Sequence, residues 1–236
     1  MAMVPPRAEL LPLTEGRWFQ RLPTEFAQAL LALGRLRTLQ PGEALFLRDS
    51  APCGLYGLVT GAMRFSGHGG DSGAAREAVL TVLTPPEWFG EIALFDDAPR
   101  THDAHAAETS TLLHVPQAAL QDWLHAHPRH WRELGWLMAD KLRLALVSME
   151  AQLLLPASQR LAQRLLVLAH GTRSSRPEGT HQRHISVTQD ELARMLGVSR
   201  QTTNQILQAL KDQGVIALQR GELEILDIDA LRARSR

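Results

Sequence analysis

The sequence contains a single cysteine, Cys53, among 236 residues. One thiol excludes a disulfide framework and cannot supply the several thiolates that hold an iron–sulfur cluster. No apolar run approaches the length of a membrane span, and the N-terminus lacks the basic-then-apolar layout of a secretory signal. These absences predict a cytoplasmic protein in a reducing setting, with no membrane partner.

Motifs of the common enzyme classes are also missing. The sequence has no nucleophile elbow, no HExxH, no Walker motif and no pair of carboxylates in a catalytic context. Gly67, Gly69 and Gly70 lie in a predicted loop, but no helix start with a lysine follows them, so they are not expected to cradle a phosphate. We therefore predict that the chain is not an enzyme.

An excess of charge is absent from the chain as a whole, which has 25 basic and 25 acidic residues. The two halves differ, however. Residues 1–155 carry 13 Lys and Arg against 17 Asp and Glu, a balance of −4, whereas residues 156–236 carry 12 against 8, a balance of +4. The small basic excess lies in the C-terminal part, which is where contact with nucleic-acid phosphates is then expected.

The stretch 187–216 reads as two short helices joined by a tight turn. Thr188 and Glu191 form an S/T-x-x-E capping box, which predicts a helix directly after Thr188. Gly197 supplies a turn residue that tolerates positive φ, and Ser199 is a good N-cap for the second helix. The pattern predicts a helix-turn-helix, whose second helix enters the major groove of DNA with its first turns leading.

The first turns of this second helix carry polar side chains and no acidic one. Arginine reads guanine bidentately, and Gln or Asn reads adenine. A helical hairpin with an ordinary solvated face, the alternative, usually mixes Glu and Lys. We expect Ser199, Thr202 and Arg194 to contact phosphates. The predicted DNA-contacting residues are Arg194, Ser199, Arg200, Gln201, Thr202, Asn204 and Gln205.

Short apolar runs alternate with turn signals between residues 37 and 115. Many short strands at close spacing predict an antiparallel barrel or roll. The segment 67–75, rich in Gly and Ser, is predicted to be a mobile hairpin loop. Residues 1–15 are expected to form a partly ordered arm, followed by a short helical segment at 16–35.

Helical periodicity returns after Gln117, and a long helix is expected between Pro128 and Pro156. Its apolar seam has the spacings 4, 3, 4, 3 and 4, a coiled-coil repeat. The seam consists of Gly135, Ala139, Leu142, Leu146, Met149 and Leu153. Other apolar residues lie off the seam, so the helix has more than one apolar face. This predicts a homodimer; packing of the seam within one subunit is the alternative.

Another amphipathic helix is expected at 158–170, followed by a polar loop at 171–180. Residues 215–228 alternate apolar and polar side chains around Arg220 and Gly221, as in a hairpin. A strand pair after the recognition helix makes a winged helix-turn-helix. The predicted fold class is therefore α+β. Its parts are an N-terminal antiparallel, jelly-roll-like β-roll sensor domain (1–128), a dimerisation helix (129–156) and a C-terminal winged helix-turn-helix domain (157–236).

This order of parts resembles the CRP/FNR family of bacterial regulators from about residue 16 onward. The sharpest match in the roll is the segment 89–101, FGEIALFDDAPRT, which is similar to the phosphate-binding cassette of cyclic-nucleotide-binding domains. Gly90 lets the backbone approach a ligand, and residues 91–95 can form a short helix with amide donors toward a phosphate. Arg100 can neutralise the phosphate, Thr101 can hydrogen-bond it, and Glu91 can accept from a ribose hydroxyl.

The predicted ligand contacts are Gly90, Glu91, Ile92, Ala93, Arg100 and Thr101. The resemblance implies a cyclic nucleotide, with cyclic AMP, cyclic GMP and cyclic di-GMP as candidates. A plain ion pair between Glu91 and Arg100, in a vestigial pocket, is the alternative reading of these residues.

Several residues depart from the family's pattern. In members that respond to cyclic AMP the long helix supplies hydroxyl groups to the adenine, but the corresponding positions here are Ala145 and Leu146. His102 and Asp103 stand where small residues are commoner, and Pro86 and Asp49 stand where glycine is common. Adenine recognition is therefore open. A leucine on the seam favours helix pairing without ligand, so DNA binding is expected to be partly ligand-independent.

Histidines support a rival reading, a metal, haem or redox sensor. His102 and His105 form one short-spaced pair, and a second group is His125, His127 and His130. Imidazoles at such spacing can share a metal, and haem needs one axial imidazole. The second group lies in a polar segment before the long helix, where solvated histidines are expected instead. No metal site is therefore predicted.

Taken together, the residues predict a homodimeric transcription regulator that binds a near-palindromic duplex. By resemblance, RNA polymerase is a further partner. An effector in the roll is expected to reorient the DNA-binding domains across a hinge near Leu155 and Pro156.

Overall fold

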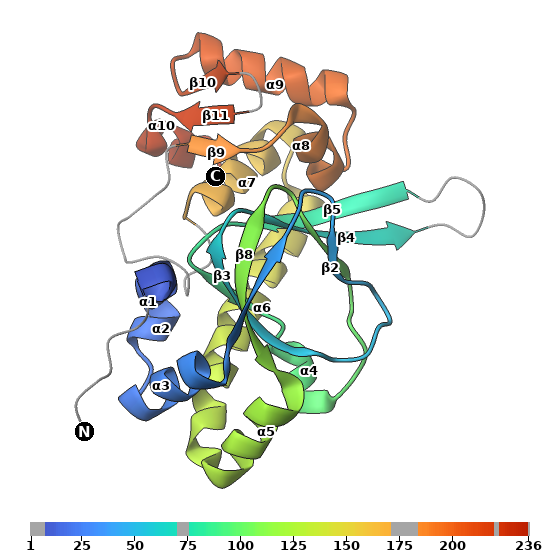
Figure 1. Ribbon diagram of the computed structural model, residues 1–236. Helices are drawn as coiled ribbons and strands as arrows, with labels where there is room; N and C mark the ends of the chain where they lie inside the picture. Colours follow the sequence, from blue (N-terminus) through green and yellow to red (C-terminus); the bar gives the residue numbers. More distant parts are fainter. Residues whose placement is uncertain (1–7, 70–75, 171–183, 220–221, 236) are drawn as a thin grey trace.

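The computed structural model describes residues 8–69, 76–170, 184–219 and 222–235 (Figure 1). Two four-stranded antiparallel sheets form the N-terminal roll, with strand orders β1-β8-β3-β6 and β2-β7-β4-β5. The strands are β1 (Arg35–Leu39), β2 (Ala44–Phe46), β3 (Gly54–Thr60), β4 (Met63–Gly69), β5 (Arg76–Leu83), β6 (Glu87–Phe89), β7 (Asp103–Ala106) and β8 (Ser110–Pro116). The predicted antiparallel roll is confirmed. Of the predicted loop at 67–75, residues 67–69 belong to β4, and 70–75 lie outside the described residues.

The strand β3 lies at the centre of this roll. It is buried from Gly54 to Val59 because β8 and β6 flank it in its own sheet and the facing sheet covers it. Leu58, Met63 and Leu112 meet in the core between the two sheets. Apolar side chains from the inner faces of both sheets thus fix the positions of β6 and β7, between which the segment 89–101 lies.

Short helices cover the outer side of the first sheet (Figure 1). They are η1 (Ala8–Leu10), α1 (Leu11–Thr14), α2 (Arg17–Gln20), α3 (Thr24–Leu33) and α5 (Gln117–Ala126). The prediction of a partly ordered arm is wrong for residues 8–15, because Leu10 and Leu13 are buried in the same cluster as Trp18 and Trp88. The Trp18 indole also donates to the Glu133 carbonyl at 2.7 Å. Residues 1–7 lie outside the described range.

The long helix α6 (Trp131–Leu154) follows the single turn η2 (Pro128–His130) and ends two residues before Pro156. Leu134 and Leu137 are fully buried against the roll. In the second half of the helix only Ala151 is buried. Its seam residues are exposed, with fractional exposures of 57% for Leu142, 52% for Leu146, 58% for Met149 and 78% for Leu153. We call these four residues the exposed stripe.

The C-terminal part is a winged helix-turn-helix, as predicted. Its elements are α7 (Ala157–His170), β9 (His184–Ser186), α8 (Gln189–Leu196), α9 (Arg200–Asp212), β10 (Ile216–Gln219), β11 (Glu222–Ile225) and α10 (Ile228–Ala233). The wing is a three-stranded sheet in the order β10-β11-β9. The predicted turn at Arg220 and Gly221 and the predicted loop at 171–180 lie outside the described residues.

The C-terminal part packs directly on the roll. The helix α8 lies against β5, and Val79 and Val82 of β5 belong to the same buried cluster as Leu161, Leu192 and Leu210. One apolar core therefore joins the two parts across the end of α6. Among the helices that the structure describes, none is both long enough and apolar enough to cross a membrane.

Candidate nucleic-acid interface and effector pocket

The helix-turn-helix has the local geometry that its sequence predicts. The Glu191 backbone amide donates to Thr188 Oγ1 at 3.2 Å, and the Thr188 amide donates to Glu191 Oε2 at 2.8 Å, so the capping box is complete. Gly197 ends α8 with φ of 64°, a conformation that glycine adopts without a Cβ penalty. Ser199 Oγ accepts from the Thr202 amide at 3.0 Å and caps α9.

The first turns of α9 present a polar face to solvent. Arg200, Gln201, Asn204 and Gln205 are all exposed, whereas Thr203 is buried and points inward. Leu207 and Leu210, with Thr203, hold the opposite face against the domain core. The polar face is thus free to enter a groove, and its orientation is set by burial of the other side.

Three predicted phosphate contacts have different surroundings. The hydroxyl groups of Ser199 and Thr202 lie 2.8 Å apart and both take part in the cap of α9. Arg194 pairs with Asp190 at 2.7 Å one helical turn earlier. Its side chain lines the cavity between the two parts of the molecule.

The cassette residues surround the start of α4 (Ile92–Asp96). Gly90 has φ of 96°, and a Cβ at this position would lie 2.6 Å from the Gly54 carbonyl oxygen. Glycine is therefore required here by a close approach of the protein's own backbone. Ala93 is buried, while Ile92 is exposed and faces the cavity rim.

Arg100 is the most informative residue of the cassette. It is only 5% exposed. Its guanidinium donates to the carbonyl oxygens of Gly90 at 3.1 Å and Gly54 at 2.7 Å, and it contacts Cys53 Sγ at 3.1 Å. Its Nε is buried without a partner. Carbonyl dipoles do not neutralise a full charge, so this buried cation fits an anionic ligand such as a cyclic phosphate.

The ion pair between Glu91 and Arg100 that the sequence allowed is absent among the described contacts. Glu91, which is 2% exposed, instead pairs with Lys141 of α6 at 2.9 Å. Lys141 also donates to the Trp88 carbonyl at 2.5 Å. Sequence reasoning missed Lys141. Its only sequence signal is its place one helical turn before Ala145 on the cavity side of α6.

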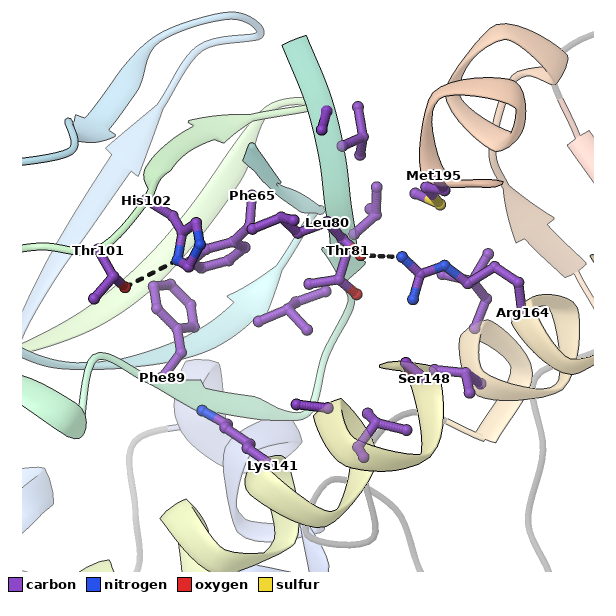
Figure 2. A pocket seen from close by; sticks show the side chains of 18 of the residues that line it. Phe65, Leu80, Thr81, Phe89, Thr101, His102, Lys141, Ser148, Arg164 and Met195 are labelled. Carbon is purple, nitrogen blue, oxygen red and sulfur yellow. Dashed lines mark hydrogen bonds between the residues drawn. The ribbon is translucent and has the colours of Figure 1, made fainter. Parts of the chain in front are cut away.

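A cavity of about 630 Å³ opens beside the cassette (Figure 2). Such a volume suits a small ligand. Thr101 and His102 lie at one end, where His102 Nδ1 and Thr101 Oγ1 are 2.9 Å apart. Burial lowers the pKa of His102, which favours the neutral ring. Ala145 lines the wall of α6 as expected, but Ser148 also lines it and supplies a hydroxyl group that sequence reasoning missed.

Asp103 and Asp49, which also depart from the family's sequence pattern, have structural explanations. Asp103 Oδ1 accepts from the Arg48 amide at 2.7 Å, and Oδ2 lies 3.1 Å from His68 Nδ1, so this carboxylate ties β7 to its neighbours. Asp49 has φ of 63°, which is the left-handed conformation that glycine favours.

Of the histidines before α6, His125 is exposed, as predicted, and His127 is partly exposed, but His130 is not solvated. His130 is 1% exposed. Its ring stacks on that of Phe26, with the centroids 5.3 Å apart, and is tilted against the Trp123 ring, with the centroids 5.1 Å apart. Aromatic neighbours from α3 and α5 bury it, which local sequence does not reveal. Among the described residues, no group of three His, Cys, Asp or Glu side chains is arranged to hold a metal ion.

A β-roll joined through a long helix to a winged helix-turn-helix is the architecture of a DNA-binding transcription regulator. Comparison with known proteins agrees. Residues 36–127 match the cyclic nucleotide-binding domain, and residues 159–234 match the Crp-like helix-turn-helix domain. The chain belongs to the CRP/FNR family and is a DNA-binding transcription regulator with a cyclic nucleotide-binding domain. The family consists of regulators rather than enzymes.

Two relatives show the extent of the similarity. The CRP-like cAMP-activated global transcriptional regulator of Mycobacterium tuberculosis is 27% identical over 85% of this chain and 90% of its own length. The cyclic AMP receptor protein of Thermus thermophilus is 29% identical over 88% of this chain and 91% of its own length. The fold is shared with FixK2 of Bradyrhizobium japonicum, with a TM-score of 0.72 and 19% sequence identity. The match covers 86% of this chain and 98% of the FixK2 chain.

Proposed function

We propose that the chain acts as a homodimer that reads a near-palindromic operator and responds to a cyclic nucleotide bound at the cassette. The observation that carries this proposal is the exposed stripe on α6. Four large apolar side chains at heptad spacing on one helix face are costly in water, and a second copy of the same helix covers them. Pairing of α6 brings two recognition helices together, one for each half-site.

The proposed base contacts come from the exposed face of α9. Arg200 reads a guanine, and Gln201, Asn204 and Gln205 set the preference at neighbouring base pairs. Ser199, Thr202 and Arg194 are the proposed phosphate contacts. Since its target is chromosomal DNA, the protein is proposed to act in the cytoplasm, with RNA polymerase as a partner.

The proposed effector site consists of Gly90, Glu91, Ile92, Ala93, Arg100 and Thr101. Arg100 would hold the cyclic phosphate, and a ribose hydroxyl would compete with Lys141 for Glu91. Lys141 lies on α6, so a ligand at Glu91 would act directly on the dimerisation helix. The proposed domains are 1–128, 129–156 and 157–236, and the proposed hinge lies at Leu155 and Pro156.

A mobility-shift titration tests the proposal. A panel of randomised duplexes first selects an operator, and the full-length chain is then titrated with and without cyclic AMP, cyclic GMP and cyclic di-GMP. We expect a specific complex without nucleotide that tightens when the effector is added. A chain that stays monomeric and ignores every duplex at low salt would overturn the proposal.

A further inference from the structure

The cavity beside the cassette continues into the DNA-binding part of the molecule. Beyond β5 and α6 it is lined by Arg160 and Arg164 of α7 and by Met195 of α8. Figure 2 shows Arg164 entering the cavity at the end opposite to Thr101 and His102, with its guanidinium directed toward β5. One continuous cavity therefore has a cassette end and an α7 end.

The lining of this cavity carries an excess of positive charge. Five cationic side chains line it, against two carboxylates. The cationic residues are Arg100, Lys141, Arg160, Arg164 and Arg194; the acidic residues are Glu87 and Glu91. Lys141 is paired with Glu91, and Arg194 with Asp190. With those two cations paired, three guanidinium groups remain in the lining against the one carboxylate of Glu87, so the excess stays positive. Arg100 lies at one end of the cavity, and Arg160 and Arg164 lie at the other.

Arg160 and Arg164 have no carboxylate partner among the residues that the structure describes. Arg160 donates to the Gln152 side-chain oxygen, and its Nε is buried without a partner. Arg164 donates to the Leu80 carbonyl, and burial lowers its pKa. The two residues are four apart on one helix, where like charges repel each other. An anion between them would relieve both the repulsion and the burial of unpaired charge.

A purely structural role for Arg160 and Arg164 does not explain why both residues carry a charge. Contact between the two parts of the molecule needs a donor for the Leu80 carbonyl, which a neutral amide supplies equally well. Two adjacent guanidinium groups facing a cavity, with a donor atom left over, are the chemistry that binds phosphate.

We propose that Arg160 and Arg164 form a second anion site, which binds a second phosphate group of the ligand whose first phosphate lies at Arg100. This proposal rests on the proposed function for the cassette end. A cyclic mononucleotide has one phosphate and neutralises one end of the cavity, whereas a cyclic dinucleotide has two and neutralises both. The ligand class whose charge matches both ends of the cavity is therefore a cyclic dinucleotide.

The position of the second site gives it a regulatory consequence. Arg160 and Arg164 belong to α7, beyond Pro156, while Arg100 belongs to the roll. A ligand held at both ends bridges the two parts of the molecule and favours the arrangement in which they are docked. A ligand held only at the cassette does not have this effect.

Isothermal titration of the full-length chain tests the proposal with cyclic di-GMP and cyclic AMP as probes. The variants are Arg164→Gln and Arg160→Gln, which keep a hydrogen-bond donor and lose the charge, and Arg100→Gln at the cassette. Arg35→Gln, on the exposed β1 outside the cavity, is the control for loss of one positive charge. Arg164→Gln and Arg160→Gln should each weaken cyclic di-GMP binding about tenfold or more and change cyclic AMP binding by less than about twofold.

The outcomes separate the second site from the cassette. If Arg100→Gln removes binding of both nucleotides but the α7 variants bind cyclic di-GMP as tightly as wild type, the second site is wrong and the cassette stands. If cyclic di-GMP binding depends on Arg164 but not on Arg100, the cassette assignment is wrong and the anion site stands. If wild type binds neither nucleotide, both assignments are wrong.

Discussion

Arg200 is the side chain on which the proposed sequence readout most depends. It lies on the first turn of α9, is exposed, and has no acidic neighbour in that turn. A bidentate contact with guanine contributes about 1–3 kcal/mol of discrimination, so Arg200→Ala should weaken operator binding by that amount and relax specificity at one base pair of each half-site.

Fluorescence anisotropy against operators with single base-pair changes measures both effects. Arg232→Ala, which removes the same charge from α10, is the control and should weaken binding to all sequences alike or leave it unchanged. A binding profile of Arg200→Ala that matches wild type at every position would remove this residue from the readout.

The contacts of Glu25 predict that the stability of the fold depends on pH. Its carboxylate contacts Arg129, His127 and His130 and so joins α3 to η2. The hydrogen bond from Arg129 is the main reason why the pKa of Glu25 lies below its ordinary value of 4.5. A depressed pKa in the folded state stabilises the fold above the unfolded pKa, and this contribution is lost as the pH falls through the folded value.

The melting temperature of wild type should therefore exceed that of Glu25→Gln near pH 7, and the difference should shrink as the pH falls below about 4.5. Glu108→Gln, which removes an exposed carboxylate from a loop, is the control. Its melting temperature should differ from that of wild type by an amount that does not shrink below about pH 4.5 in the same way. Calorimetric scans from pH 7 to pH 3 measure the effect. A constant gap between wild type and Glu25→Gln would show that the ion pairs are unimportant.

Residues whose role depends on their own helix could be predicted from sequence, and residues whose role depends on packing could not. The polar face of α9, its Ser199 cap and the turn at Gly197 follow from neighbours within four positions. The pairing of Lys141 with Glu91, 50 residues apart in sequence, depends on how α6 crosses β6. Burial of His130 likewise depends on α3 and α5, which the local sequence does not show.

At the scale of elements, the capping box holds the start of α8 in place. Thr188 Oγ1 satisfies the Glu191 amide, and Thr188→Ala leaves that amide without its partner. Loss of such a cap costs about 1 kcal/mol, so the DNA-binding part should unfold at lower denaturant concentration. Thr188→Ser keeps the hydroxyl and is the matched control. Urea denaturation followed by far-ultraviolet dichroism checks the difference, and equal midpoints for the two variants would contradict it.

The exposed stripe on α6 makes a separate prediction. Leu146→Glu places a charge in the middle of the proposed helix pair, opposite its own copy, and should convert the dimer to a monomer. Sedimentation velocity measures the state. Leu36→Glu changes a leucine that is also exposed, on β1, and should leave the dimer intact. A Leu146→Glu chain that sediments like wild type would mean that α6 does not pair the subunits.

For the whole molecule, a dimer with two recognition helices requires two half-sites on the same face of the duplex. Centres about one helical turn apart satisfy this. Insertion of about five base pairs between the half-sites turns one of them to the opposite face, so affinity should fall to that of a single half-site. Mobility-shift assays measure it, with the Leu146→Glu chain as control, which should be indifferent to the insertion. Equal affinity of wild type for both operators would exclude a rigid dimer.

The order of the roll, long helix and winged domain was predictable, because each has its own periodicity and turn signals. The way in which the C-terminal part docks on β5 was not. Val79, Val82 and Met195 look like ordinary core residues in sequence, and only the tertiary arrangement brings them into one cluster. The α7 end of the cavity was hidden for the same reason.

The apolar core shared by β5 and the winged domain limits how freely the halves of this chain can be exchanged. A sensor fragment that stops at Pro156 would expose Val79 and Val82, which are buried in the intact chain. It would also lose three guanidinium groups, those of Arg160, Arg164 and Arg194, from the wall of the cavity. A chimera that joins this N-terminal part to another DNA-binding domain therefore needs a matching α7 and α8. Without them, one wall of the cavity is missing. The contact surface between the two parts of this molecule therefore includes the wall of the cavity beside the cassette, and a separation at Pro156 cuts through that wall.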